Sequence, residues 1–140
     1  MKLNSKDYKI IEILKQNSRI SIRDLARKAN LRPSTVHQRI LRLKQNNIIE
    51  KFTIKLNNKE VGENFIVFML ISAQKEIDNK VFHNKHIKEV FGITGEYDLL
   101  LKLKFKDVEE FNSYIIKFRK EYDIKKTLTM VSTITIKEEI

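Results

Sequence analysis

Apolar residues recur at helical spacing in two successive stretches near the start of the chain. The first stretch predicts a helix from about Ser5 to Gln16, with Ser5 as its cap and Asp7 in its first turn. The second predicted helix is short and begins at Ser21, which makes a capping-box-like start with Asp24. Its apolar side chains follow positions i, i+3, i+4 and i+7: Ile22, Leu25, Ala26 and Ala29.

A third predicted helix follows after a turn formed by residues 30–32. Pro33 suits its first turn, because the N–H that proline lacks would have no partner there. One face of this helix is apolar, with Val36, Ile40 and Leu43. The outer face is polar and basic and comprises Ser34, Thr35, His37, Gln38, Arg39, Leu41 and Arg42. A short helix, a tight turn and a second helix with such a face form the helix-turn-helix pattern.

The segment from Ile49 to Leu56 alternates between apolar and polar positions. This alternation predicts one strand with Phe52, Ile54 and Leu56 on the same side, ended by Asn57-Asn58. We expect this linker strand to join two domains. Its apolar side favours pairing with another element, for which a second subunit is one candidate.

From Val61 onward the pattern changes to strands alternating with helices. The stretch Phe65–Ala73 is apolar on both faces, which predicts a strand buried from two sides. The later predicted elements are a helix over Ile77–Ile87, strands over Lys88–Thr94 and Asp98–Phe105, a helix from Asp107, and a last strand over Lys126–Ile136. The order is βαββαβ, the ferredoxin-like arrangement, in which both helices cover one side of an antiparallel sheet. The predicted fold class is therefore α+β.

Such a sheet keeps one face free of helices. Strands as apolar as Phe65–Ala73 are not stable with that face in water, so we expect two copies to meet through their sheets. A two-fold dimer also carries two recognition helices, that is, two copies of the third predicted helix. Pairs of this kind meet successive major grooves about 34 Å apart on one side of the duplex.

The net charge of +10 lies entirely in the first 60 residues. Residues 1–60 hold 15 Lys/Arg against 5 Asp/Glu, whereas residues 61–140 hold 13 against 13. A polyanionic partner that presents phosphates explains this asymmetry, and arginine and glutamine read base edges in the major groove. We therefore predict binding to double-stranded DNA through Arg32, Ser34, Thr35, His37, Gln38, Arg39 and Arg42. A three-helix bundle with a merely solvated basic face is the alternative.

The composition excludes several other classes. The chain has no cysteine, which excludes a disulfide scaffold, a thiol nucleophile and a Cys-ligated zinc site. Three glycines do not suffice for a P-loop or a dinucleotide fingerprint, and no apolar run approaches the ~20 residues of a membrane span. His83 and His86 have a spacing that suits a metal, but no third ligand lies near, so we interpret them as surface histidines. We expect a cytoplasmic protein without cofactor, metal, catalytic residues or membrane partner.

Three segments carry specific motifs: Leu25-Ala26, Val36–Ile49 and Ile93–Leu103, which together pair V-x-x-R-I-x-x-L with a later T-G-x-x-D. In these segments the chain resembles the Lrp/AsnC regulators, also called feast/famine regulatory proteins. The resemblance covers essentially the whole chain. It implies a winged helix-turn-helix domain over residues 1–48, a linker strand over 49–62 and a RAM (ACT-like) ligand-sensing and dimerisation domain over 63–140. It also implies homodimers that often assemble further, up to octamers, and transcription control that responds to amino acids.

Effectors of the family bind between subunits, close to the turn that matches residues 95–98 here. The resemblance therefore implies ligand contacts from Gly95, Tyr97, Asp98, Thr129 and Ser132. A tight glycine turn exposes N–H groups to a carboxylate, and Asp98 can accept from an ammonium group. The alternative is structural: Gly95 permits the turn, and Asp98 caps it through an Asx-type hydrogen bond.

The chain departs from its relatives at two helix ends. Relatives usually have Ser or Thr where Arg32 stands and Gly where Asn47 stands, although asparagine also adopts the left-handed conformation. We predict a sequence-specific transcriptional regulator of amino-acid-related genes, and no enzyme. Two alternatives stay open: an architectural protein that coats DNA, and an Lrp-like tetrapyrrole decarboxylase, against which the basic recognition face argues.

Overall fold

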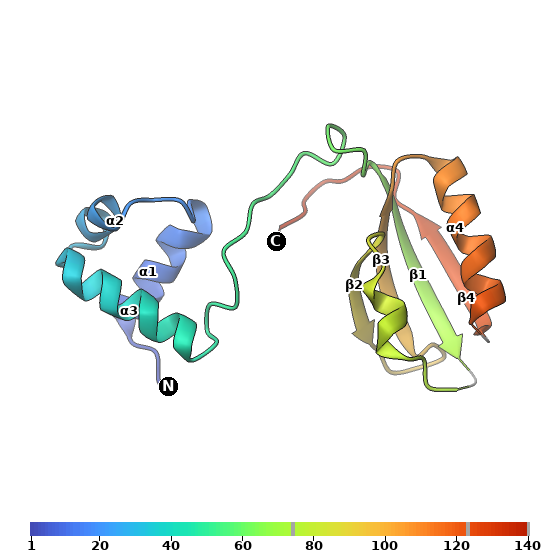
Figure 1. Cartoon of the computed structure of the whole chain (residues 1–140), viewed down its shortest axis with the longest axis horizontal. Helices are drawn as coiled ribbons and strands as arrows, with labels where there is room; N and C mark the ends of the chain where they lie inside the picture. The colour runs from blue at the N-terminus through green and yellow to red at the C-terminus, as the bar shows by residue number, and fades with distance from the viewer. Residues whose placement is uncertain (74, 123, 140) are drawn as a thin grey trace. The chain divides into compact units, whose positions relative to one another are not determined.

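The structure is a computed structural model that describes residues 1–73, 75–122 and 124–139. It divides into two compact units, Met1–Lys55 and Leu56–Glu139, the first helical and the second built on a sheet (Figure 1). The division between the units falls inside the segment predicted to link them. Among the described residues, no helix combines the length and apolar character that crossing a membrane requires.

Each helix of the first unit begins at a residue suited to capping or starting it. The helices are α1 (Ser5–Gln16), α2 (Ile22–Ala29) and α3 (Pro33–Gln45). Asn4, and not the expected Ser5, caps α1: its side chain accepts from the N–H of Asp7, whose carboxylate accepts from the N–H of Asn4. Ser21 caps α2 as predicted, by accepting from the N–H of Asp24.

The apolar stripes of the three helices meet in one core. Its fully buried side chains are Ile10, Leu25, Val36 and Leu43. The turn between α2 and α3 is tight because Asn30 adopts a left-handed conformation, with φ of 56°. Asn47, with φ of 55°, ends α3 in the way predicted from the sequence. These turns fix α3 against α2 in the helix-turn-helix arrangement.

The linker segment is not a strand in the single chain, and the prediction of a strand there is therefore wrong for the isolated chain. Residues 50–57 have no regular secondary structure. The Ser18 hydroxyl donates to the carbonyl of Thr53, and the Nζ of Lys44 lies 5.8 Å from the centre of the Phe52 ring. The side chains of Phe52, Ile54 and Leu56 are exposed. A strand needs a neighbour for its N–H and C=O groups, and no described segment of this chain provides one.

The second unit is a four-stranded antiparallel sheet in the order β2-β3-β1-β4. Its elements are β1 (Phe65–Ala73), the 3-10 helix η1 (Asn79–His83), β2 (Ile87–Gly92), β3 (Leu99–Phe105), α4 (Val108–Glu121) and β4 (Ile124–Val131). Asp107 caps α4 by accepting from the N–H of Glu110. The order of elements matches the predicted α+β, ferredoxin-like arrangement.

One predicted element of this unit is much shorter than expected. The helix predicted over Ile77–Ile87 is only η1, which follows Asp78. Asn84 ends it in an extended conformation, and its side chain accepts from the N–H of His86. Asparagine side chains that bind nearby backbone groups compete with helix formation, so the helix stops after five residues.

The two faces of the sheet differ. The buried face packs against α4 and η1, and its core comprises Val67, Met69, Ile71, Leu101, Leu103, Phe105, Ile115 and Phe118. On the other face Phe68 lies between its cross-strand partners Lys102 and Met130, and Leu128 and Met130 are exposed. In one copy this second face is therefore open along β4, as the sequence predicts, whereas Ile66 and Lys104 on the same face are buried.

The last strand ends at Val131 and not at Ile136, because residues 132–139 leave the sheet. The N–H of Ser132 donates to the carbonyl of Ile66, which is the last bond that continues the pairing of β4 with β1. Beyond it, Ile134 and Ile136 are 72% and 93% exposed. The alternation of Thr and Ile seen in the sequence continues past the strand, but none of the described strands pairs with this segment.

Candidate nucleic-acid interface and effector turn

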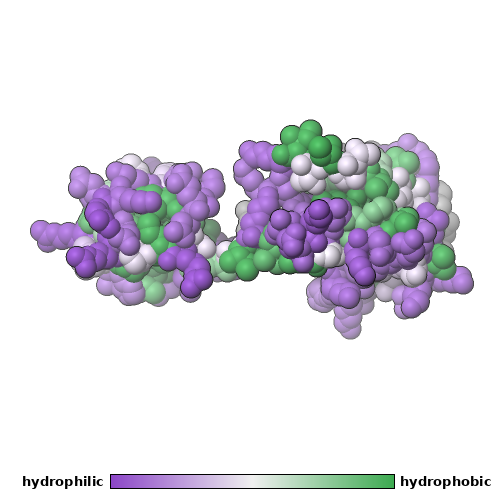
Figure 2. Space-filling view, turned by 90° about the horizontal axis from the view of Figure 1, so that it is seen from above, coloured by the Kyte–Doolittle hydropathy of each residue, from purple (hydrophilic) through white to green (hydrophobic). Residues whose placement is uncertain are grey.

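The outer face of α3 presents most of the predicted DNA contacts to solvent. Arg32, Ser34, His37, Gln38 and Arg42 are exposed, and Thr35 is half-buried. They share this face because Val36 and Leu43, on the opposite side of the helix, are buried in the core. In Figure 2 hydrophilic side chains cover most of the visible surface of the helical unit.

The start of α3 lacks a side-chain cap. Arg32 occupies the N-cap position with extended backbone, and its side chain makes no capping hydrogen bond. The N–H of Val36 already donates to the carbonyl of Arg32, so the N–H groups of Ser34 and Thr35 are the ones left at this end. Free N–H groups at a helix N-terminus attract phosphate oxygens.

Arg39 does not lie on the outer face, and this expectation is corrected. Its Nη1 lies 2.7 Å from Oδ1 of Asp7 and 3.1 Å from Oδ1 of Asn4, and its side chain is 16% exposed. The Asp7 side chain is 2% exposed. Burial by itself raises the pKa of Asp7, but the Asn4 N–H and the Arg39 guanidinium outweigh burial and lower it. Arg39 thus holds the recognition helix against the start of α1.

Several basic side chains of the helical unit are free of ion pairs. Arg27 pairs with Asp24, but no ion pair among the described residues involves Arg23, Arg32 or Arg42. Arg23 lies exposed on α2, and sequence reasoning did not single it out. The charge excess of residues 1–60 could have drawn attention to Arg23, because the first helix of a helix-turn-helix crosses the DNA backbone.

The turn between β2 and β3 contains three of the predicted ligand residues. Gly95 has φ of 121°, a conformation that favours glycine. The carboxylate of Asp98 accepts from the N–H of Ala73 at 3.0 Å, and the N–H of Asp98 donates to the carbonyl of Ile71. Asp98 therefore ties the turn to the end of β1, and not to its own turn as an Asx-type cap would.

An ion pair that the sequence analysis missed flanks this turn. Lys126 of β4 pairs with Glu96, and its Nζ lies 5.2 Å from the centre of the Tyr97 ring. The hydrogen bond between them raises the pKa of Lys126 and lowers that of Glu96. Sequence spacing gives no sign of this pair because 30 residues separate its members.

The structure does not bring Ser132 to the turn within one chain. The N–H of Ser132 bonds to Ile66 at one end of β1, whereas Asp98 bonds to Ala73 at the other. At about 3.3 Å per residue these ends are roughly 23 Å apart. Thr129 lies between them, opposite Met69, and its buried hydroxyl has no hydrogen-bond partner among the described residues.

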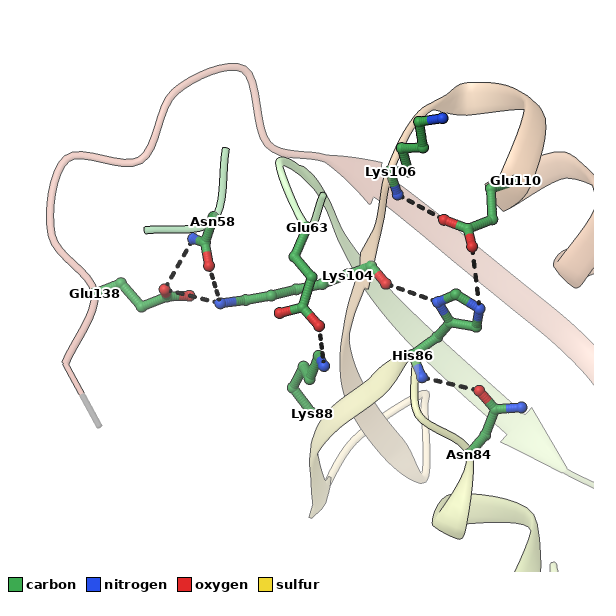
Figure 3. Close-up of polar contacts among 9 residues, drawn as sticks. All are labelled: Asn58, Glu63, Asn84, His86, Lys88, Lys104, Lys106, Glu110 and Glu138. Atoms are coloured by element: carbon green, nitrogen blue, oxygen red, sulfur yellow. Dashed lines mark hydrogen bonds and ion pairs between the residues drawn. The ribbon is translucent and has the colours of Figure 1, made fainter. Parts of the chain in front are cut away.

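His86 is packed, which corrects its interpretation as a surface residue, whereas His83 is exposed. The His86 ring stacks on Phe105 at 4.6 Å, and its Nδ1 lies 2.9 Å from the carbonyl oxygen of Lys104. Its Nε2 lies 3.6 Å from Oε1 of Glu110, and Figure 3 shows the ring between this carboxylate and the Lys104 carbonyl. Within the described part of the chain, no three acidic or histidine side chains group in a way that suits a metal ion.

Comparisons with known proteins cover both units. Residues 3–50 match the winged helix-turn-helix DNA-binding family, and residues 67–140 match the Lrp/AsnC ligand binding domain. An HTH-type transcriptional regulator from Pyrococcus horikoshii is 38% identical over 146 residues, which cover 99% of this chain and 97% of the relative.

Two solved structures share the fold over nearly the whole length. LrpC from B. subtilis is 27% identical with a TM-score of 0.88, and the match covers 99% of this chain and 100% of that one. A transcriptional regulator from Neisseria meningitidis, solved as a complex with L-Met, is 23% identical with a TM-score of 0.90, and the match covers 99% and 94% of the two chains.

Proposed function

Because the chain belongs to the Lrp/AsnC family of transcriptional regulators, we propose that it is a sequence-specific regulator that binds DNA as a homodimer and responds to an amino-acid effector. The family regulates transcription and is not a family of enzymes. The observation that carries the proposal is the outer face of α3, where exposed Arg32, Gln38 and Arg42 have no acidic partner among the described residues.

In the proposed complex α3 lies in the major groove. Gln38 reaches a base edge, Arg42 reaches a base edge or a phosphate, Arg32 and the N–H groups of the first turn bind phosphate, and Thr35 and His37 complete the contact face. Ser34, next to the uncapped start, adds a phosphate contact. Arg39 is a positioning residue in this scheme, since it reaches α1 and not the DNA.

The homodimer provides the second recognition helix. The open sheet face carries exposed Leu128 and Met130, and covering it with the same face of a second copy removes apolar surface from water. Further assembly, up to an octamer, extends the same proposal. A cytoplasmic location is part of the same proposal and is supported by the match to a DNA-binding family.

The proposed effector site is centred on the turn at Gly95. The exposed carboxylate of Asp98 accepts from the ammonium group of an amino acid, and the N–H groups of the turn bind its carboxylate. Tyr97 and Lys126 form one side of this site. Ser132 joins it only from a second copy, because the length of β1 separates Ser132 from the turn in one chain. Thr129 pairs with Met69 on the helix-covered face and its hydroxyl is buried, so it lies outside the proposed site. The L-Met complex of the Neisseria meningitidis relative makes L-Met the first effector to test, and genes of amino-acid metabolism the first targets.

The substitution Asp98→Asn tests effector binding without changing the DNA-binding face. The amide oxygen still accepts from the N–H of Ala73, but the negative charge that holds an ammonium group is lost. Fluorescence anisotropy on DNA from upstream of the protein's own gene, with and without L-Met and the other amino acids, is the measurement. We expect any effector to change the affinity of the wild type for DNA at least threefold and the affinity of Asp98→Asn not at all.

Asp107→Asn is the matched control, because Asp107 caps α4 in the same unit and lies outside the proposed site. This variant should keep the response to the effector. A response that survives in Asp98→Asn contradicts the proposed site.

A further inference from the structure

Two lysines stand on the open, largely apolar face of the sheet. Lys102 and Lys104 of β3 are cross-strand partners of Phe68 and Ile66, and their side chains are 15% and 10% exposed. Removing ammonium groups from water is costly unless opposite charges and hydrogen bonds compensate. The compensation here comes from far along the chain.

Glu138, close to the C-terminus, binds both lysines. One carboxylate oxygen lies 2.7 Å from Nζ of Lys102 and the other 2.9 Å from Nζ of Lys104. Asn58, in the loop before β1, donates to the same carboxylate and accepts from Lys104 at 2.8 Å (Figure 3). The cluster therefore ties the C-terminal segment 132–139, the loop before β1 and the middle of β3 together.

The charges of this cluster are balanced. Glu89 of β2 lies 3.3 Å from Nζ of Lys102, so two lysines face two glutamates. Burial alone raises the pKa of Glu138, but Lys102, Lys104 and Asn58 lower it to about 2. Glu138 therefore stays ionised well below neutral pH, and in formal charges the two glutamates offset the two lysines.

We propose that Glu138 is an ionic latch that fixes the C-terminal segment beside the open sheet face and keeps that face neutral, so that a second copy can pack against it. The proposal rests on the homodimer proposed above. In a two-fold contact a patch meets its own copy, so any net charge on the patch faces the same charge. The latched segment also presents the exposed Ile134 and Ile136 next to this face.

Single substitutions that unbalance the cluster test the proposal. Glu138→Gln leaves one excess positive charge and Lys104→Met one excess negative charge, whereas the double variant is neutral again. Sedimentation equilibrium of the full chain at 0.1 M salt measures the dimer dissociation constant. We expect each single substitution to raise it at least tenfold and the double variant to lie within threefold of the wild type. Glu139→Gln is the matched control, because its exposed carboxylate pairs only with Lys137 among the described residues, and it should change the constant less than twofold.

Hydrogen exchange at the Ser132 amide is a second readout of the latch. We expect faster exchange in Glu138→Gln and unchanged exchange in Glu139→Gln. If Glu138→Gln does not fold, the dimer dissociation constants of Lys104→Met and of the double variant still compare an unbalanced cluster with a neutral one.

The outcomes separate this inference from the proposed function. If the wild type is a dimer and Glu138→Gln and Glu139→Gln change its dissociation constant equally, the proposed latch is wrong and the proposed homodimer stands. A wild-type chain that is monomeric at all concentrations overturns both. DNA binding by the full chain is measured separately, by fluorescence anisotropy, and binding by a monomeric chain would have to come from a single copy of α3.

Discussion

Arg39 and Arg42 lie three residues apart on the same helix and have different surroundings. The guanidinium of Arg39 is bound to Asp7 and Asn4 of the first helix, whereas Arg42 is exposed and forms no ion pair among the described residues. The helical repeat of 3.6 residues explains part of the difference, because position 39 lies at the border of the buried stripe. The long arginine stem then reaches the carboxylate that the capping box of α1 already fixes.

The two arginines are therefore expected to respond differently to substitution. Arg42→Ala removes a phosphate or base contact and makes the slope of log K against log salt shallower by about 0.9 if the contact is to phosphate. Arg39→Ala leaves that slope unchanged but lowers the free energy of unfolding by about 1–3 kcal/mol, since it leaves the buried Asp7 without its partner. Binding titrations at several salt concentrations and thermal unfolding are the measurements. If the slopes of the two variants are equal and both are shallower than the slope of the wild type, Arg39 contacts DNA after all.

The sequence predicts outward-facing residues of α3 well because they depend only on the period of one helix. It does not predict the partner of Arg39, because Asp7 lies 32 residues earlier and the meeting depends on how two helices cross. The same reason applies to Lys126 and Glu96, which β-sheet pairing brings together. Residue types and periods are local, whereas contacts between elements are set by the packing of the whole unit.

At the scale of elements, helices α1 to α4 and their turns agree with the sequence better than strand ends do, whereas the helix predicted over Ile77–Ile87 is reduced to η1. The caps at Ser21 and Asp107 and the left-handed Asn47 lie where local chemistry places them. Alternation over residues 49–56 and 132–136 predicts strands that the single chain does not form, because a strand requires a partner as well as a pattern. Both segments carry exposed apolar side chains, which is what the proposed contact between copies would cover.

The turn between β2 and β3 provides a test at this scale. A Cβ at Gly95 meets open space, but φ of 121° strains any other residue, so Gly95→Ala should lower the free energy of unfolding by about 1–3 kcal/mol. Gly92 also has open space around its position and does not have a positive φ. Gly92→Ala is thus the matched control and should change stability by less than ~1 kcal/mol. Thermal denaturation compares the two, and equal losses would contradict the backbone strain assigned to Gly95.

At the scale of the whole molecule, charge and apolar surface are divided between the two units. Residues 1–60 carry the entire net charge of +10, and residues 61–140 are neutral. A basic helical unit suits a polyanion, and a neutral sheet unit allows two copies to approach without repulsion. This division fits the proposed dimer, in which the exposed face of α3 binds DNA and the contact between open sheet faces brings together the two copies of α3 that a two-fold site needs.

Footprinting on DNA upstream of the protein's own gene tests the proposed two-fold, sequence-specific regulator most directly. We expect protection of two half-sites related by a palindrome, with centres one helical turn or a multiple of one turn apart, about 34–36 Å for a single turn. Arg42→Ala should weaken protection of both half-sites together. Uniform protection along the fragment at every protein concentration, with no palindrome, would contradict sequence-specific binding and would instead favour a protein that coats DNA.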